Sequence, residues 1–143
     1  MKELNILLIE DNEGDILLTK EAFEESKIAN RIQTIKDGRA AIDYFESMTD
    51  QQQFPNLVLL DINLPKISGH DVLSFMRQSE RFKGIPVVML STSSAEKDIL
   101  QSYQNNVNCY ITKPIDIDEF INAIRKIEVF WSDYVAVTGK FRA

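Results

Sequence analysis

Cysteine and long apolar runs are scarce in this chain of 143 residues, and each scarcity excludes a class of protein. Cys109 is the only cysteine, so an internal disulfide is excluded, and a lone thiol suits a reducing compartment. The sequence has no apolar run long enough to span a bilayer, and a strand rather than a signal peptide follows the first residues. We therefore expect a cytoplasmic protein that does not insert into the membrane.

Basic residues and histidine are also few. The 16 lysines and arginines are outnumbered by 22 aspartates and glutamates, which gives a formal net charge of -6. Such a chain is repelled by a phosphate backbone, so we expect no direct binding to nucleic acid. His70 is the only histidine, and its position favours an exposed residue in the first turn of a helix over a phosphodonor.

The chain does contain a strand and helix pattern that alternates five times. The strands are predicted at 4–9, 31–35, 57–60, 87–90 and 107–112. The first four helices should end near residues 26, 45, 80 and 105, and the fifth should begin near 116. Short connections between buried strands predict an α/β fold, with a flavodoxin-like, doubly wound, five-stranded parallel sheet in the order 2-1-3-4-5 and five helices.

Polar residues at predicted helix starts support this pattern. Asn12 is expected to cap the first helix, with Asp15 three residues later, and Ser68 to cap the third. Ser93 and Glu96 have the S-x-x-E spacing of a capping box, which predicts that the fourth helix begins after Ser93.

Further polar residues stand where the predicted strands end. Asp61 follows four consecutive aliphatic residues, which are typical of a strand that is covered on both faces. Because the first and third strands are neighbours in the predicted order, Glu10 and Asp11 should meet Asp61. The ends of the next two strands should bring Ser91 and Lys113 to the same rim of the sheet.

This set of side chains has a definite chemistry. Three carboxylates close together repel one another, so either a pKa rises or a cation binds. Oxygen ligands favour a hard ion, and Mg2+ takes one or two carboxylates together with a phosphoryl oxygen. With the ion bound, one carboxylate can remain ionised and attack phosphorus to give an aspartyl-phosphate. An ammonium group and a hydroxyl would stabilise the charge on the transferred group.

Over about residues 4 to 129, these motifs resemble the receiver domain of the two-component response-regulator family. The resemblance implies a stand-alone regulator that receives a phosphoryl group from a histidine kinase, a signalling protein rather than an enzyme. Residues 1–129 would form the receiver domain and residues 130–143 an aromatic extension of it. The matching residues are Glu10 and Asp11, Asp61, Ser91, and Lys113 followed by Pro114.

The resemblance also implies roles in phosphoryl transfer and signalling. Asp61 would be the phosphoacceptor, and Ser91 and Lys113 would hold the phosphoryl group. The Lys113–Pro114 bond would be cis. Ser91 and Tyr110 fall at the switch positions of the family, and phosphorylation would change the face formed by the fourth helix, fifth strand and fifth helix.

A Mg2+ cofactor is implied as well. Asp11 and Asp61 would bind the ion directly, Glu10 through a water molecule, and Asn63 through its backbone carbonyl. Two residues depart from the commoner pattern of the family: Glu10 replaces an aspartate and Ser91 a threonine. These departures affect the expected metal affinity and phosphate lifetime, and leave the mechanism unchanged.

Within the family, the chain most resembles small regulators paired with bacterial phytochrome histidine kinases, through 85–88, 107–110 and the tail that begins at Phe130. The implied partners are a phytochrome-type sensor kinase and an unknown downstream protein. The apolar face of the last helix continues through Phe130, Trp131 and Tyr134. We expect these aromatics to form a two-fold homodimer surface. The alternative is a tail that folds back on its own domain.

The sequence fits three other functions less well. A flavodoxin-type cofactor binder needs a hydroxyl- or glycine-rich phosphate loop where this chain has Glu10, Asp11 and Glu13. A haloacid-dehalogenase-like phosphatase needs a general acid two residues after its nucleophile, where this chain has Asn63. An interaction module that is never phosphorylated is disfavoured by the complete set of site residues.

Overall fold

The computed structural model describes residues 3–26, 29–113 and 116–138. Five parallel strands form one sheet in the order β2-β1-β3-β4-β5, which confirms the predicted flavodoxin-like topology. Backbone pairing continues without a break from β2 across to β5. The strands are β1 (Leu4–Ile9), β2 (Asn30–Ile35), β3 (Leu57–Leu60), β4 (Val87–Ser91) and β5 (Cys109–Thr112).

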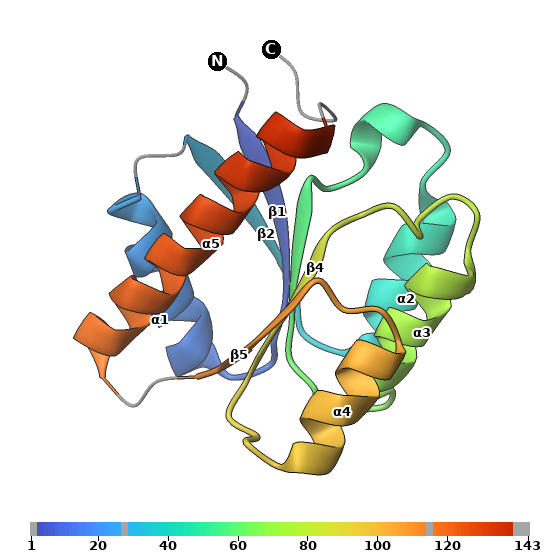
Figure 1. Ribbon diagram of the computed structural model, residues 1–143. Coiled ribbons are helices and arrows are strands. Elements are labelled where there is room, and N and C mark those ends of the chain that lie inside the picture. Colours follow the sequence, from blue (N-terminus) through green and yellow to red (C-terminus); the bar gives the residue numbers. More distant parts are fainter. Residues whose placement is uncertain (1–2, 27–28, 114–115, 139–143) are drawn as a thin grey trace.

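In the part of the chain that the structure describes, five α-helices cover the two faces of the sheet (Figure 1). Helices α1 and α5 pack together on one face, and α2, α3 and α4 cover the other. None of the described helices has the combination of length and apolar character that a membrane span requires. The helices are α1 (Glu13–Glu24), α2 (Gly38–Ser47), α3 (Gly69–Gln78), α4 (Glu96–Gln104) and α5 (Ile117–Thr138), and a short 3-10 helix covers Gln51–Gln53.

The core consists of one apolar layer on each face of the sheet. Successive side chains of a strand point to opposite faces, so β1 contributes Leu7 and Ile9 to the layer under α2 and α3. It contributes Ile6 and Leu8 to the layer under α1 and α5. All four residues of β3 are fully buried, as expected for a central parallel strand that reads as a continuous apolar run.

Two of the predicted helix caps are confirmed. The Asn12 side chain accepts a hydrogen bond from the N–H of Asp15 at 2.9 Å, and α1 begins at the next residue after Asn12. Ser68 accepts from the N–H of Asp71 at 3.3 Å at the start of α3. These bonds satisfy backbone donors that the first turn of a helix leaves without a partner.

Two local predictions around α4 are wrong. Helix α4 begins at Glu96 with Ala95 as its N-cap, so Ser93 lies two residues too early to cap it, and no side chain does. The Ser93 Oγ accepts from the N–H of Ala95 at 3.3 Å, in the loop before the helix, and donates its hydrogen to Asp98 at 2.6 Å. His70 is not exposed: only 7% of it is accessible, and its Nε2 lies 3.2 Å from Asp98 Oδ1.

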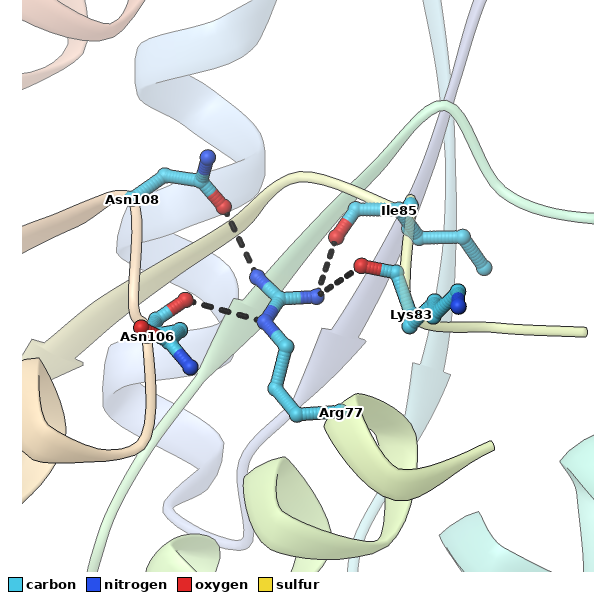
Figure 2. A pocket seen from close by; sticks show the side chains of 6 residues that line it. Arg77, Lys83, Ile85, Asn106 and Asn108 are labelled. Atoms are coloured by element: carbon cyan, nitrogen blue, oxygen red, sulfur yellow. Dashed lines mark hydrogen bonds between the residues drawn. The ribbon is translucent and has the colours of Figure 1, made fainter. Parts of the chain in front are cut away.

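At the edge of the sheet where β4 and β5 begin, Arg77 of α3 joins two loops (Figure 2). Its Nε donates to the carbonyl of Asn106 at 2.9 Å, and Nη1 donates to the carbonyls of Ile85 and Lys83 at 2.8 and 3.1 Å. Nη2 donates to Asn108 Oδ1 at 2.9 Å. These residues line a pocket of about 330 Å³. Arg77 therefore fixes the entries to β4 and β5.

Candidate functional site

At the carboxyl ends of the strands, on the side of the sheet opposite to Arg77, three side chains come together. Glu10, Asp61 and Lys113 each come directly after a strand, and the sheet hydrogen bonding continues into these residues. The N–H of Asp61 donates to the carbonyl of Ile9 at 3.1 Å, and that of Lys113 to the carbonyl of Ser91 at 2.7 Å. The sheet itself thus positions the backbone of each residue. The predicted convergence at one rim is present.

The carboxylates of Glu10, Asp11 and Asp61 form a cluster. Each offers an oxygen atom, and these atoms all lie within 4.8 Å of one another. Glu10 and Asp61 are buried, whereas Asp11 is exposed to solvent. Oxygen ligands at this spacing, with one side open, suit a hard divalent cation that retains part of its water shell. The residues therefore fit a metal ion of this kind.

Lys113 lies inside this cluster, with 9% of the residue accessible. Its Nζ contacts Glu10 Oε1, lies 2.8 Å from Asp15 Oδ2 and lies 3.5 Å from Asp61 Oδ2. Burial alone would lower the pKa of Lys113, but hydrogen bonds to Asp15 and Glu10 and the charge of Asp61 hold that pKa above its usual value. The ammonium group therefore stays charged and compensates part of the negative charge.

Ionisation of Glu10 is unfavourable, because Glu10 is buried and lies beside another carboxylate. Burial raises the pKa of Glu10 from 4.5 to about 7, and the charge of Asp61 adds to this increase. The bonds that Glu10 accepts from Lys113 and from the N–H of Asn12 act in the opposite direction. Near neutral pH, Glu10 is thus poised to exchange a proton for a cation.

Asp61 is held from two sides. Its Oδ1 accepts a hydrogen bond from the N–H of Ile62 at 2.8 Å, and its Oδ2 faces Lys113. The start of α3 packs directly on its backbone: a Cβ added to Gly69 would lie 2.0 Å from the carbonyl oxygen of Asp61. Asn63 follows in the β3–α3 loop as an exposed residue, and the metal role of its carbonyl stays a prediction.

The two predicted switch residues both contact the β4–α4 loop. Ser91 is fully buried, and its Oγ accepts from the N–H of Ser93 at 3.3 Å. The Tyr110 hydroxyl donates to the carbonyl of Ser93 at 2.7 Å. Burial raises the pKa of Tyr110, while hydrogen bonds with Ser93 and Ser91 partly offset this effect. Tyr110 is half-buried, with its hydroxyl on the β4–α4 loop.

Asp15 is a site residue that the sequence reasoning missed, because it was interpreted only as part of a helix start. Its carboxylate, in the first turn of α1, reaches Lys113 across the rim. A signal was available: Asp15 lies in the first turn of the helix that starts directly after the end of β1, where Glu10 and Asp11 stand. A carboxylate there should reach the ends of the neighbouring strands.

Some predictions fall outside the described residues. The Lys113–Pro114 bond is one, because residues 114 and 115 are not described. The side chains of Phe130, Trp131 and Tyr134 are others, although the backbone of α5 is helical through their positions.

Comparison with known proteins identifies the family. The response regulator receiver domain matches residues 6–125. The chain belongs to this family. Response regulator Rcp1 of Synechocystis sp. (strain ATCC 27184 / PCC 6803 / Kazusa) is 38% identical over 134 residues, which cover 92% of this receiver and 91% of Rcp1. The probable methanogenesis regulatory protein FilR2 of Methanothrix harundinacea (strain 6Ac) is 40% identical over 127 residues, which cover 88% and 82% of the two chains.

Solved structures of relatives have the same fold as this receiver. The phosphorylated cyanobacterial phytochrome response regulator RcpA matches with a TM-score of 0.83 and 40% identity, covering 91% of this chain and 94% of RcpA. The Mn(2+)-bound form of Rcp1 matches with a TM-score of 0.80 and 39% identity, covering 89% and 93%. The predicted resemblance to phytochrome-associated response regulators is therefore confirmed.

Proposed function

We propose that this receiver accepts a phosphoryl group on Asp61 from a histidine kinase, in a reaction that requires Mg2+. The observation that carries the proposal is the position of Lys113, a buried ammonium group that contacts Asp61 and the acidic residues beside it. A cation held against a buried carboxylate at the end of a central strand is suited to stabilising a transferred phosphoryl group. The protein would act on itself and turn over no other substrate.

The metal would be held by Asp11 and Asp61 directly, by Glu10 through water, and by the carbonyl of Asn63. When bound, Mg2+ supplies positive charge that lets the carboxylates remain ionised side by side and neutralises phosphoryl oxygens. The bound metal in the Mn(2+) form of Rcp1 supports a divalent ion in this family. The cluster of three carboxylates supports it in this chain.

The protein residues would then perform the transfer. A carboxylate oxygen of Asp61 attacks phosphorus, the bond from phosphorus to the kinase histidine breaks, and its electron pair leaves with the imidazole. Lys113 moves its ammonium group from Glu10 and Asp15 toward the transferred oxygens. The Ser91 hydroxyl, now turned to the N–H of Ser93, donates to the same group.

The first prediction tests the phosphoacceptor. Wild type that is incubated with acetyl phosphate and Mg2+ should gain the mass of one phosphoryl group, in an adduct that is stable in acid and labile in base. Asp61→Asn should gain none, because an amide is not a nucleophile of this kind. Mass spectrometry is the measurement, and omission of Mg2+ is the control. A full yield of adduct in Asp61→Asn would exclude this assignment.

Phosphorylation would shift the α4, β5 and α5 face through Ser91 and Tyr110, and the partners would be a phytochrome-type kinase in the cytoplasm and a downstream protein that reads this face. The phytochrome regulator RcpA and the bacteriophytochrome response regulator RtBRR, 40% and 38% identical to this chain, support the kinase type.

We also propose that Phe130, Trp131 and Tyr134 form a two-fold homodimer surface. The support is that α5 continues as a helix to Thr138, beyond Ile127 of the apolar core layer, and that the described side chain of Val129 is exposed. The second prediction is that wild type dimerises and that beryllofluoride with Mg2+ tightens the dimer, whereas Trp131→Ala weakens it. Sedimentation equilibrium is the measurement. A wild type that stays monomeric in both conditions, or a Trp131→Ala that dimerises equally well, would contradict the proposal.

A further inference from the structure

His70 is a buried histidine that the proposed phosphotransfer does not use. Its Nε2 lies 3.2 Å from Asp98 Oδ1, on a different helix, and its Nδ1 has no hydrogen-bond partner among the described residues. A carboxylate oxygen can only accept a hydrogen bond, so Nε2 carries the hydrogen and donates it to Asp98. His70 therefore joins the beginning of α3 to the beginning of α4.

Asp98 extends this connection into the β4–α4 loop. Its second oxygen, Oδ2, accepts the hydroxyl hydrogen of Ser93 at 2.6 Å. The hydrogen bonds from Ser93 and His70 hold the pKa of Asp98 below its usual value. Asp98 is thus an ionised acceptor: one carboxylate oxygen accepts from His70 of α3, and the other accepts from Ser93 of the β4–α4 loop.

Ser93 is the residue where the connections meet. Its N–H donates to Ser91 Oγ at 3.3 Å, and its carbonyl accepts the Tyr110 hydroxyl at 2.7 Å. Its own hydroxyl is held by Asp98. One loop residue therefore contacts both predicted switch residues and, through Asp98, the buried histidine. The position of its carbonyl sets where the Tyr110 hydroxyl can bind.

At its other end, this series of contacts reaches the backbone of Asp61, the proposed phosphoacceptor. Gly69, the residue before His70, donates its N–H to the carbonyl of Ile62 at 2.8 Å. A Cβ on Gly69 would overlap the carbonyl oxygen of Asp61 at 2.0 Å. Because α3 begins in such close contact with the segment after β3, any movement of that segment would displace His70 as well.

We propose that His70 and Asp98 are positioning residues of the switch. They hold Ser93 so that its carbonyl keeps the Tyr110 hydroxyl against the β4–α4 loop, which we name the inward arrangement of Tyr110. They thereby provide a second connection from Asp61 to Tyr110, in addition to Ser91. The dependence on phosphorylation rests on the proposed function, but the hold on Tyr110 does not.

The experiment observes Tyr110 directly by 19F NMR of protein labelled with 3-fluorotyrosine. The chain has four tyrosines, and Tyr110→Phe identifies the signal of interest. In Asp98→Ala, the equilibrium between the inward and outward signals should shift outward by roughly tenfold, since one charge-assisted bond to the loop is lost. Glu96→Ala, an exposed residue of the same helical turn, is the matched control and should match wild type. A Tyr110 signal in Asp98→Ala that coincides with wild type overturns the proposal.

A double-mutant cycle separates positioning from a general effect on stability. His70→Leu should shift the same equilibrium by roughly threefold, and adding it to Asp98→Ala should cause no further shift, because His70 acts through Asp98. His70→Gln keeps a donor group and should recover part of the wild-type signal. Fully additive shifts, or equal behaviour of the Leu and Gln variants, overturn the role of His70.

If the His70 and Asp98 variants do not fold, Ser93→Ala provides an independent test of the same proposal. The residue lies in a loop, and its loss should also shift Tyr110 outward by removing the bond to Asp98. Each variant is measured without ligand and with beryllofluoride and Mg2+. A wild type that neither responds to beryllofluoride nor labels with acetyl phosphate contradicts the proposed function, whereas the unliganded Tyr110 signals still decide for or against the role of His70 and Asp98.

Discussion

Two cationic side chains lie at opposite ends of the strands and are held in different ways. We name the carboxyl ends of the strands, where Lys113 lies, the carboxylate edge, and the ends where β4 and β5 begin, where Arg77 lies, the neutral edge. Lys113, at the carboxyl ends of the strands, contacts carboxylates from the β1 and β3 ends and from α1. The hydrogen bonds of Arg77 in Figure 2 go to neutral oxygens, three of which are backbone carbonyls. Backbone carbonyls cannot move without breaking the fold, whereas carboxylates can exchange one cation for another. The edge held by carboxylates is therefore the one suited to chemistry.

The third prediction, with the largest effect, removes the cation from the carboxylate edge. Lys113→Met should lower the rate of acetyl phosphate labelling at saturating Mg2+ by roughly a hundredfold, the usual cost of losing one charge-stabilising donor. The labelling time course by mass spectrometry measures it. Lys126→Met is the control, because Lys126 lines the neighbouring pocket between β5 and α5 and is exposed. A Lys113→Met rate within twofold of the control, a difference on the order of 0.4 kcal/mol in activation free energy, would remove Lys113 from the mechanism.

The fourth prediction concerns the pH dependence of stability, because ionisation of the buried Glu10 at the carboxylate edge is unfavourable. The pKa of Glu10 is raised from 4.5 to about 7, so between these values the folded state binds more protons than the unfolded state. This contribution to stability is complete below pH 4.5 and is lost as the pH rises through about 7, by roughly 3 kcal/mol. Urea unfolding at pH 5 to 8 without metal should show the loss.

Two controls sharpen the pH experiment. Glu10→Gln cannot ionise at this position, so its stability should vary less over the same pH range than that of wild type. Added Mg2+ should restore the stability of wild type at pH 8, because the ion replaces the lost proton and binds only the folded cluster. Wild type and Glu10→Gln curves that run in parallel would show that Glu10 is not the titrating group.

The strand order and the main rim residues could be predicted because they depend on position along the chain. Apolar runs that end on charged residues place those residues at one edge of a parallel sheet, whatever the side chains contact there. Asp61 and Lys113 follow from this rule alone. The wrong predictions concern the exact helix start and contacts between elements: α4 begins three residues after Ser93, and local spacing does not mark Asp98 as the partner of Ser93 or of His70.

Arg77 illustrates the same limit at the other edge. Its partners in Figure 2 are backbone carbonyls of residues 83, 85 and 106 and the side chain of Asn108, up to 31 residues away in sequence. A backbone carbonyl carries no residue type, so no pattern marks it as the partner of an arginine. Only the assembled loops create the site. The sequence therefore offers no reason to distinguish Arg77 from a solvated surface arginine.

The fifth prediction tests whether this neutral edge serves stability alone. Arg77→Leu removes the hydrogen bonds drawn in Figure 2 and leaves the partly buried carbonyl of Ile85 without this donor, so the free energy of unfolding should fall by roughly 2 kcal/mol. Arg77→Lys should recover little, because an ammonium group cannot reproduce the planar fork that spans both loops. Urea unfolding measures both variants.

The matched control for Arg77 is Arg39→Leu, whose exposed ion pairs with Asp43 and Glu46 should contribute less than about 1 kcal/mol. The folded fraction of Arg77→Leu should label with acetyl phosphate at the wild-type rate, because the hydrogen-bond partners of Arg77 in Figure 2 lie away from the carboxylate edge. A labelling rate that falls together with stability would mean that the two edges are coupled through β4 and β5. Their separation into a structural edge and a chemical edge would then be wrong.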